Sequence, residues 1–190
     1  MSTPFSFRRS LRCGVALALL TALALAPSAL AQSGSGGIGL PGASGATVKG
    51  SQAKLRDGRA IAPESAPAKV KRAIRAANEI AKGHPYCYGG GHARWRSSCY
   101  DCSGSVSYAL GKYGARIVDS PLPSGSFSSW GKRGKGRWIT VYANSGHAFV
   151  VIAGLRFDTS QTPGQGPGWS ENVRAGLANG PFDKRHRGKL

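Results

Sequence analysis

The sequence has few acidic residues. Eight aspartates and glutamates stand against 26 lysines and arginines, so the 190-residue chain carries a formal net charge of +18. Such an excess favours contact with polyanions. Nucleic acid is not expected as that polyanion, because the basic residues are scattered and no nucleic-acid-binding motif accompanies them. No internal repeat is visible either, which leaves one compact domain with a tail as the expected organisation.

The N-terminal apolar stretch, residues 14–25, is too short for a stable membrane span. Three arginines precede it and small residues at 29–31 follow it, which predicts a secretory signal peptide over residues 1–31. We therefore expect a secreted protein of 159 residues with a charge of +15, located in the periplasm or the extracellular cell wall. Its polyanionic partners there are anionic cell-wall polymers, peptide-stem carboxylates and lipid head groups. The residue directly after the predicted cleavage point is Gln32 and not a cysteine, so no lipid anchor and no stable membrane insertion are expected after cleavage.

Composition divides the rest of the chain in two. Residues 32–66 are rich in glycine, serine, alanine and proline and lack an apolar period, which predicts a flexible linker. Residues 67–190 form the predicted domain. Apolar residues at helical spacing over 70–80 predict a core helix, and Gly83 closes it.

A second helix is predicted to start at Cys102 and to stop at Gly114, because a residue able to cap precedes it and apolar residues then recur on one face. Unpaired backbone N–H groups and the helix dipole at such a start favour a thiolate. His147 opens an apolar run and lies 45 residues further on, so only the fold can bring these two side chains together as nucleophile and base. Taken singly, each is as well explained as a small buried residue or an ordinary strand-end residue.

Three strands are predicted in the second half, over 138–142, 147–153 and 156–160, and they read as an antiparallel meander. Helices first and a sheet afterwards indicate an α+β architecture. A glycine-rich connection over 115–136 is longer than compact domains usually have and is expected to border a cleft. Three glycines at 89–91 allow the backbone to approach a ligand closely.

Three motifs in this order resemble the NlpC-type cell-wall peptidases, a papain-like family. They are Pro85-Tyr86-x-Tyr88-Gly89-Gly90, then Asp101-Cys102-Ser103-Gly104 at a helix start, then Gly146-His147 at a strand start. The match covers roughly residues 67–160. The resemblance implies a papain-like fold in which N-terminal helices, including the nucleophile helix, pack on an antiparallel sheet. It also implies hydrolysis of peptidoglycan stem peptides, often between D-glutamate and a diamino acid, with no cofactor and no metal.

Position by position, the resemblance makes Cys102 the nucleophile and His147 the general base. The third member is expected on the following strand, where Asp158 matches best and Ser160, on the same strand face, competes with it. The Cys102 backbone N–H would contribute to an oxyanion hole. The implied substrate-binding residues are Tyr86, Asp101 and Ser103.

The predicted mature chain keeps three cysteines, Cys87, Cys99 and Cys102, so one thiol should stay free in an oxidising compartment. A bridge between Cys87 and Cys99 would leave Cys102 free. Two alternatives stay open. The C-x-x-C spacing of Cys99 and Cys102 suits a thiol oxidoreductase, and the cysteines together with His84 or His92 suit a zinc site. Both alternatives are less favoured, because no βαβ strand precedes Cys99 and a zinc site leaves the strand histidine without a role.

Two classes of function therefore remain. The first is a secreted cysteine peptidase that acts on peptidoglycan through an acyl-enzyme, and the second is a catalytically idle wall-binding module that uses the groove and the basic surface. The presence of both Cys102 and His147 favours the first. Acyl transfer to an amine or alcohol on the same fold is a third, weaker possibility.

Overall fold

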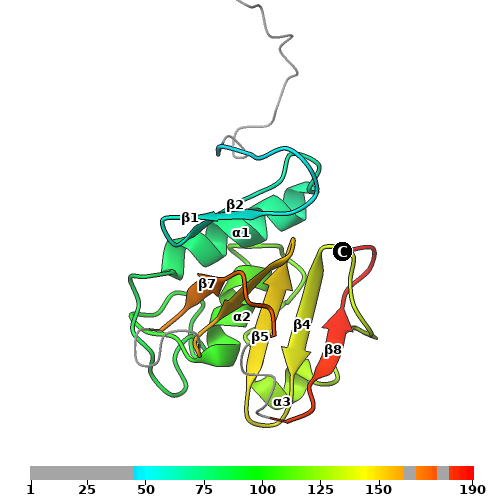
Figure 1. The fold of residues 1–190 in the computed structure, drawn as a ribbon. Coiled ribbons are helices and arrows are strands. Elements are labelled where there is room, and N and C mark those ends of the chain that lie inside the picture. Colours follow the sequence, from blue (N-terminus) through cyan, green and yellow to red (C-terminus); the bar gives the residue numbers. More distant parts are fainter. Residues whose placement is uncertain (1–44, 161–165, 175–179) are drawn as a thin grey trace, which may run out of the picture. The chain divides into compact units, whose positions relative to one another are not determined.

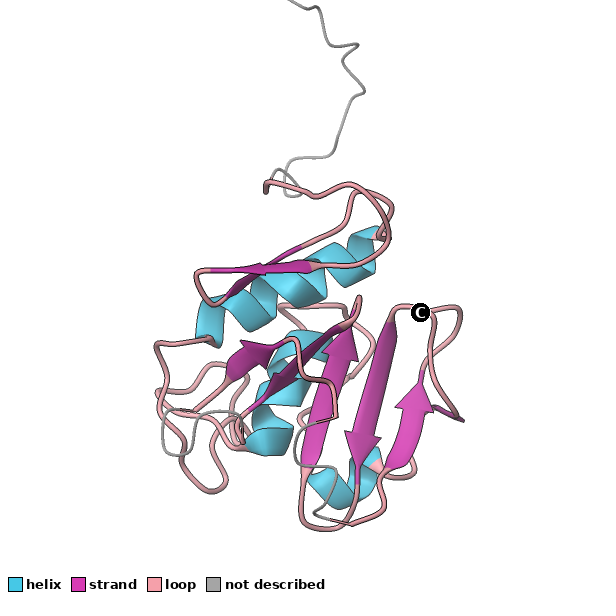
Figure 2. Cartoon of the chain, viewed as in Figure 1, coloured by secondary structure: helices cyan, strands magenta, loops and turns pink. Residues whose placement is uncertain are grey.

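A computed structural model describes residues 45–160, 166–174 and 180–190. The predicted signal peptide and the first part of the predicted linker lie outside the described residues. All described residues belong to one unit, residues 39–190. This unit combines helices with antiparallel sheets, which confirms the α+β prediction (Figures 1 and 2).

The predicted core helix is α1 (Ala68–Ile80), and its apolar face is buried. The second helix, α2 (Cys102–Leu110), is buried along its whole length. It stops before the predicted end at Gly114. The reason is tertiary: the Leu110 carbonyl accepts the backbone amides of Ile117 and Val118, at 2.9 and 3.2 Å, as the chain turns back over the helix end.

The larger sheet has six strands in the order β3-β8-β4-β5-β6-β7, and every neighbouring pair is antiparallel. Its strands are β3 (Lys132–Arg133), β4 (Ile139–Ala143), β5 (Ala148–Ile152), β6 (Leu155–Asp158), β7 (Gly168–Ser170) and β8 (Asp183–His186). A separate two-stranded sheet consists of β1 (Lys54–Arg56) and β2 (Arg59–Ile61). Strands β4, β5 and β6 form the predicted meander. Strand β8 was not predicted, and it inserts between β3 and β4. Figure 1 shows β8 beside β4.

The second part of the predicted linker, residues 45–66, belongs to the folded unit instead. Strands β1 and β2 form a hairpin that lies along α1 in Figure 1. Its turn residues Asp57 and Gly58 both have positive φ, 49° and 72°. The Asn78 side chain on α1 accepts the backbone N–H of Ala60 at 2.9 Å and donates to its carbonyl at 2.8 Å. The Asp-Gly turn was the signal for this hairpin, and the glycine-rich composition around it obscured that signal.

The core lies between the helices and the larger sheet. Helix α2 contacts α1, β5 and β6, so its first turn lies close to the strands that carry the predicted histidine and carboxylate. The long connection over 115–136 contains α3 (Ser124–Phe127), which packs on β4. Within the described ranges no helix has the length and apolar character needed to cross a membrane.

Candidate active site

Cys102 is the first residue of α2, and only 8% of its surface is exposed. The helix begins here because Asp101 caps it: the Asp101 carboxylate accepts the Gly104 backbone N–H at 2.6 Å. Glycine is required at 104, because a Cβ there would collide with the carbonyl oxygen of Gly90. Among the described cysteines Cys102 alone keeps a free thiol.

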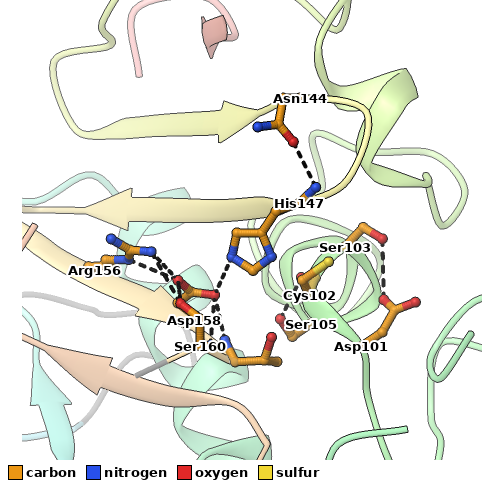
Figure 3. A network of polar contacts seen from close by, with 10 residues as sticks. Asp101, Cys102, Ser103, Ser105, Asn144, His147, Arg156, Asp158 and Ser160 are labelled. Atoms are coloured by element: carbon orange, nitrogen blue, oxygen red, sulfur yellow. Dashed lines mark hydrogen bonds and ion pairs between the residues drawn. The ribbon is translucent and has the colours of Figure 1, made fainter. Parts of the chain in front are cut away.

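His147 is held immediately before β5 by the turn that leaves β4. The Asn144 side-chain oxygen accepts the backbone N–H groups of Gly146 and His147, at 3.0 and 2.9 Å. The Asn144 backbone N–H in turn donates to the His147 carbonyl at 3.0 Å. These bonds fix the backbone at His147. Figure 3 shows its imidazole between Cys102 on α2 and Asp158 on β6.

The electrostatics of His147 favour its protonated form. Its Nε2 lies 2.9 Å from Asp158 Oδ1, and Figure 3 shows the other ring nitrogen turned toward Cys102. Burial lowers the pKa of His147, but hydrogen bonds and charge interactions with Asp158 and Cys102 outweigh burial and raise the pKa from 6.5 to about 9. The ring therefore carries a proton at neutral pH and presents a positive charge to the Cys102 sulfur (Figure 3).

Asp158 is fully buried and accepts hydrogen bonds at both oxygens. Oδ1 accepts from His147, from the backbone N–H of Thr159 at 2.6 Å and from that of Ser160 at 3.2 Å. Oδ2 accepts from the Arg156 guanidinium and from the Ser160 hydroxyl at 2.7 Å. Burial alone would raise the pKa of Asp158, but His147, Arg156 and Ser160 together hold it below its usual value. Of the two competitors for the third position, Asp158 contacts the imidazole and Ser160 supports Asp158.

Tyr86 lies close enough to Cys102 for a charge interaction between the two side chains. A short parallel bridge pairs it with Tyr100, which precedes the helix-capping Asp101. Its side chain is 44% exposed. The pKa of Tyr86 is raised by partial burial first and then by negative charge at Cys102 and Asp101, so its hydroxyl stays protonated next to the thiol.

The other two predicted substrate-binding residues form a cluster with His92. His92 Nε2 lies 3.0 Å from Asp101 Oδ1 and 3.2 Å from Ser103 Oγ, and the Ser103 hydroxyl donates to the same Asp101 oxygen at 3.2 Å. Asp101 Oδ2 accepts the backbone N–H of Gly89 at 3.1 Å. The structure therefore brings Asp101 and Ser103 together beside Cys102 and ties both to the glycine-rich loop.

Cys87 and Cys99 are joined by a disulfide, with their Cα atoms 5.6 Å apart. The closed loop is tight, because a Cβ on Gly90 would come within 2.5 Å of the Cys87 sulfur. Since the Cys99 sulfur is bonded to Cys87, Cys99 and Cys102 do not form a C-x-x-C redox pair in this structure. The described residues hold no group of three or more His, Cys, Asp or Glu side chains placed to bind a metal.

Three residues of the site were missed from the sequence: Asn144, Arg156 and Phe182. Asn144 two residues before a glycine is typical of a turn, and that pattern does not by itself indicate a role in the site. Arg156 is a charged residue within an otherwise apolar strand pattern, and this exception to the pattern was the signal that could have indicated a buried, paired charge. The Phe182 ring packs edge-on against the His147 ring, with centroids 6.2 Å apart. No local signal pointed to Phe182, because its place depends on where β8 inserts.

Comparisons with known proteins found one weak structural similarity to report. No protein-family model matches the chain, and no curated protein matches it. Among solved structures, the chain is similar to the P60 domain of an antigen from M. avium subspecies paratuberculosis. The identity is 16%, the TM-score is 0.43, and the match covers 62% of this chain and 93% of that chain. A likeness of this size carries no conclusion about the activity of this chain.

Proposed function

We propose that this chain is a secreted cysteine peptidase that hydrolyses the peptide stems of bacterial peptidoglycan. The observation that carries the proposal is a free cysteine at a helix start that faces a histidine, which is in turn hydrogen-bonded to a buried carboxylate (Figure 3). The substrate class rests on the motif resemblance, and export rests on the signal-peptide pattern. The bond between D-glutamate and a diamino acid is the proposed point of cleavage.

The reaction begins when the Cys102 sulfur attacks the carbonyl carbon of the scissile amide. A C–S bond forms, and the carbonyl electron pair moves to the oxygen, which the Cys102 backbone N–H at the start of α2 stabilises. His147 then gives its proton to the amide nitrogen as the C–N bond breaks, and the amine leaves. The product of this half-reaction is a thioester between Cys102 and the acyl part of the stem peptide.

Hydrolysis of the thioester uses the same residues in reverse order. Neutral His147 takes a proton from water as the water oxygen attacks the thioester carbon. The C–S bond breaks, the carboxylic acid leaves, and the sulfur and the imidazolium return to their starting states. Throughout, Asp158 holds the imidazole in one orientation and stabilises its positive charge.

The test is mass spectrometry of purified peptidoglycan after incubation with the chain. We expect Cys102→Ala and His147→Ala to release no peptide fragments, and Asp158→Asn to lower the rate by about 10-fold to 10⁴-fold. His186→Ala is the matched control, because His186 lies on β8 outside the site and its ring nitrogen Nδ1 lies 3.2 Å from the carbonyl oxygen of Gly188 in the following turn. Identical fragment spectra from wild type and Cys102→Ala on several peptidoglycan types would refute the peptidase. New amide or ester products in the presence of added amine or alcohol would show acyl transfer.

A second candidate function, attachment to anionic cell-wall polymers, is favoured by a basic cleft on this unit. A cavity of about 380 Å³ is bordered by Lys69, Arg116, Arg187 and Lys189, with Asp119 as its acidic side chain. A neighbouring cavity of about 290 Å³ shares Arg116 and Asp119 with it. None of the residues that line these cavities belongs to the Cys102 site. Attachment and catalysis are therefore compatible, and Cys102→Ala should retain wall binding.

A further inference from the structure

A fully buried arginine lies behind the candidate active site. Arg156 precedes Asp158 by two residues on β6, so the two side chains share one face of the strand. A buried guanidinium is unfavourable unless it is paired. Its Nε donates to Asp158 Oδ2 at 2.9 Å, and its Nη2 donates to the same oxygen. The Cζ atom of the guanidinium lies 3.7 Å from the centre of the Phe149 ring.

The two oxygens of Asp158 face different sides of the site. Both donors of Arg156 and the Ser160 hydroxyl bind Oδ2, whereas Oδ1 binds the imidazole Nε2 of His147 and the backbone N–H groups of Thr159 and Ser160. A carboxylate rotates easily about its last side-chain torsion. The guanidinium on Oδ2 opposes this rotation together with the two backbone N–H groups on Oδ1, and so helps to keep Oδ1 on the imidazole.

The hydrogen bonds of the buried guanidinium are directed to one side. Its Nε and Nη2 donate to Asp158, whereas its Nη1 is buried and has no hydrogen-bond partner among the described residues. Asp158 is therefore the acidic group that pairs with the charge of Arg156.

No other charged group in the described ranges shares this position. Strands β5 and β7 flank β6 and carry no titratable side chain. Helix α2 contributes the Cys102 thiol, which faces His147, and the Tyr108 hydroxyl, which donates to Glu79 on α1 at 2.8 Å. The charges that face Asp158 are therefore those of Arg156 and His147.

We propose that Arg156 is a positioning residue of this site, which binds Oδ2 of Asp158 and thereby keeps the carboxylate ionised with Oδ1 directed at His147. The expected effect of Arg156 on catalysis rests on the proposed peptidase function, whereas its effect on the Asp158 carboxylate does not. The lowered pKa of Asp158, to which the Arg156 charge contributes, agrees with this role. Arg156 acts through Asp158 and does not touch the reacting atoms.

Two variants separate charge from packing. Arg156→Met keeps an apolar stem against Phe149 but removes the charge, whereas Arg156→Lys keeps the charge and loses the forked geometry. Arg133→Met is the matched control, because Arg133 is exposed and pairs at 3.8 Å with Asp183 on another strand. The readouts are the NMR titration of the Asp158 carboxyl carbon, the solvent exchange of the His147 Nε2 proton, and kcat and KM on peptidoglycan stems.

For Arg156→Met we expect the carboxyl of Asp158 to titrate at higher pH than in wild type and the Nε2 proton of His147 to exchange faster. We expect kcat to fall roughly tenfold with KM unchanged, because the contact between Arg156 and Asp158 affects proton transfer by His147 and not substrate binding. Arg156→Lys should restore the Asp158 titration close to that of wild type. Arg133→Met should match wild type in every readout.

The proposal is overturned if Arg156→Met leaves the Asp158 titration unchanged, or if the Met and Lys variants behave alike. Should Arg156→Met fail to fold, the wild-type protein still tests the proposal. A pKa of Asp158 at or above the ordinary value of 3.8 would contradict the positioning role of Arg156. The NMR readouts do not depend on catalysis. If wild type releases no fragments while the Asp158 titration follows the charge at position 156, the peptidase fails and the positioning role stands.

Discussion

The protonation of His147 should make the stability of the folded chain fall as the pH rises through the range from 6.5 to about 9. Burial lowers the pKa of this histidine, but its bonds and charge interactions with Asp158 and Cys102 raise it from 6.5 to about 9. The folded state therefore holds the proton more tightly than the unfolded state does. The resulting stabilisation is complete below pH 6.5, and it is lost as the pH rises through about 9.

The size of this effect follows from the difference between the two pKa values. A separation of about 2.5 pH units at roughly 1.36 kcal/mol each corresponds to about 3 kcal/mol. Solvent screening reduces it little, because the side chain of His147 is 17% exposed and that of Asp158 is 0% exposed. For a domain whose total stability is of the order of 5–15 kcal/mol, such a loss is large.

Urea unfolding at a series of pH values between about 6 and 10 measures the effect. Other groups titrate in this range, so the quantity of interest is the difference between wild type and His147→Gln, which keeps a polar side chain but has no proton to lose. We expect the stability of wild type to fall more steeply, by about 3 kcal/mol in total, with an unchanged m-value. Parallel curves for the two proteins would refute the ion pair between His147 and Asp158.

Three further predictions concern the cysteines and the basic cleft. Iodoacetamide under non-reducing conditions should add one group to the predicted mature chain, at Cys102. Peptide mapping that finds the label on Cys87 or Cys99 would contradict the site. Replacing Cys87 and Cys99 together by alanine should lower the free energy of unfolding in chemical denaturation by about 3 kcal/mol, because the disulfide closes a loop of 12 residues. An unchanged unfolding midpoint would mean that the loop is ordered without the disulfide. Binding of the Cys102→Ala protein to purified cell walls should weaken with added salt. The substitutions Arg116→Gln and Arg187→Gln in the basic cleft should weaken it further. Binding that does not depend on salt would exclude attraction by surface charge.

Local patterns in the sequence determined several elements correctly. The apolar period over 70–80 is realised as α1, and the alternating and apolar runs after residue 138 are realised as β4, β5 and β6. The start of α2 was also predictable, because Asp101 before small residues is a capping signal. These features depend on neighbours a few residues apart, so the sequence contains them directly.

Candidate residues were likewise readable where a short motif carried them. The structure places Cys102 at the first residue of α2 and His147 immediately before β5, close to the predicted helix and strand starts. The sequence alone left Asp158 and Ser160 as competitors for the third position, because both lie on the same strand face. Only their relation to the imidazole distinguishes them, and that relation depends on the pairing of β5 with β6.

The tertiary structure alone decided the rest. Strand β8 lies between β3 and β4 although more than 35 residues separate β8 from either of them in the chain, and no local pattern specifies such a pairing. The Asp-Gly turn is a local signal for the hairpin, but its attachment to α1 through Asn78 is a tertiary contact. The contact of the Arg156 guanidinium with one oxygen of Asp158 is likewise a feature of the folded chain. The sequence by itself therefore determined which residues are able to do chemistry and where the local elements begin. Which of them meet, and in which orientation, was decided by long-range packing, because a buried charge finds its partner only after the strands have paired.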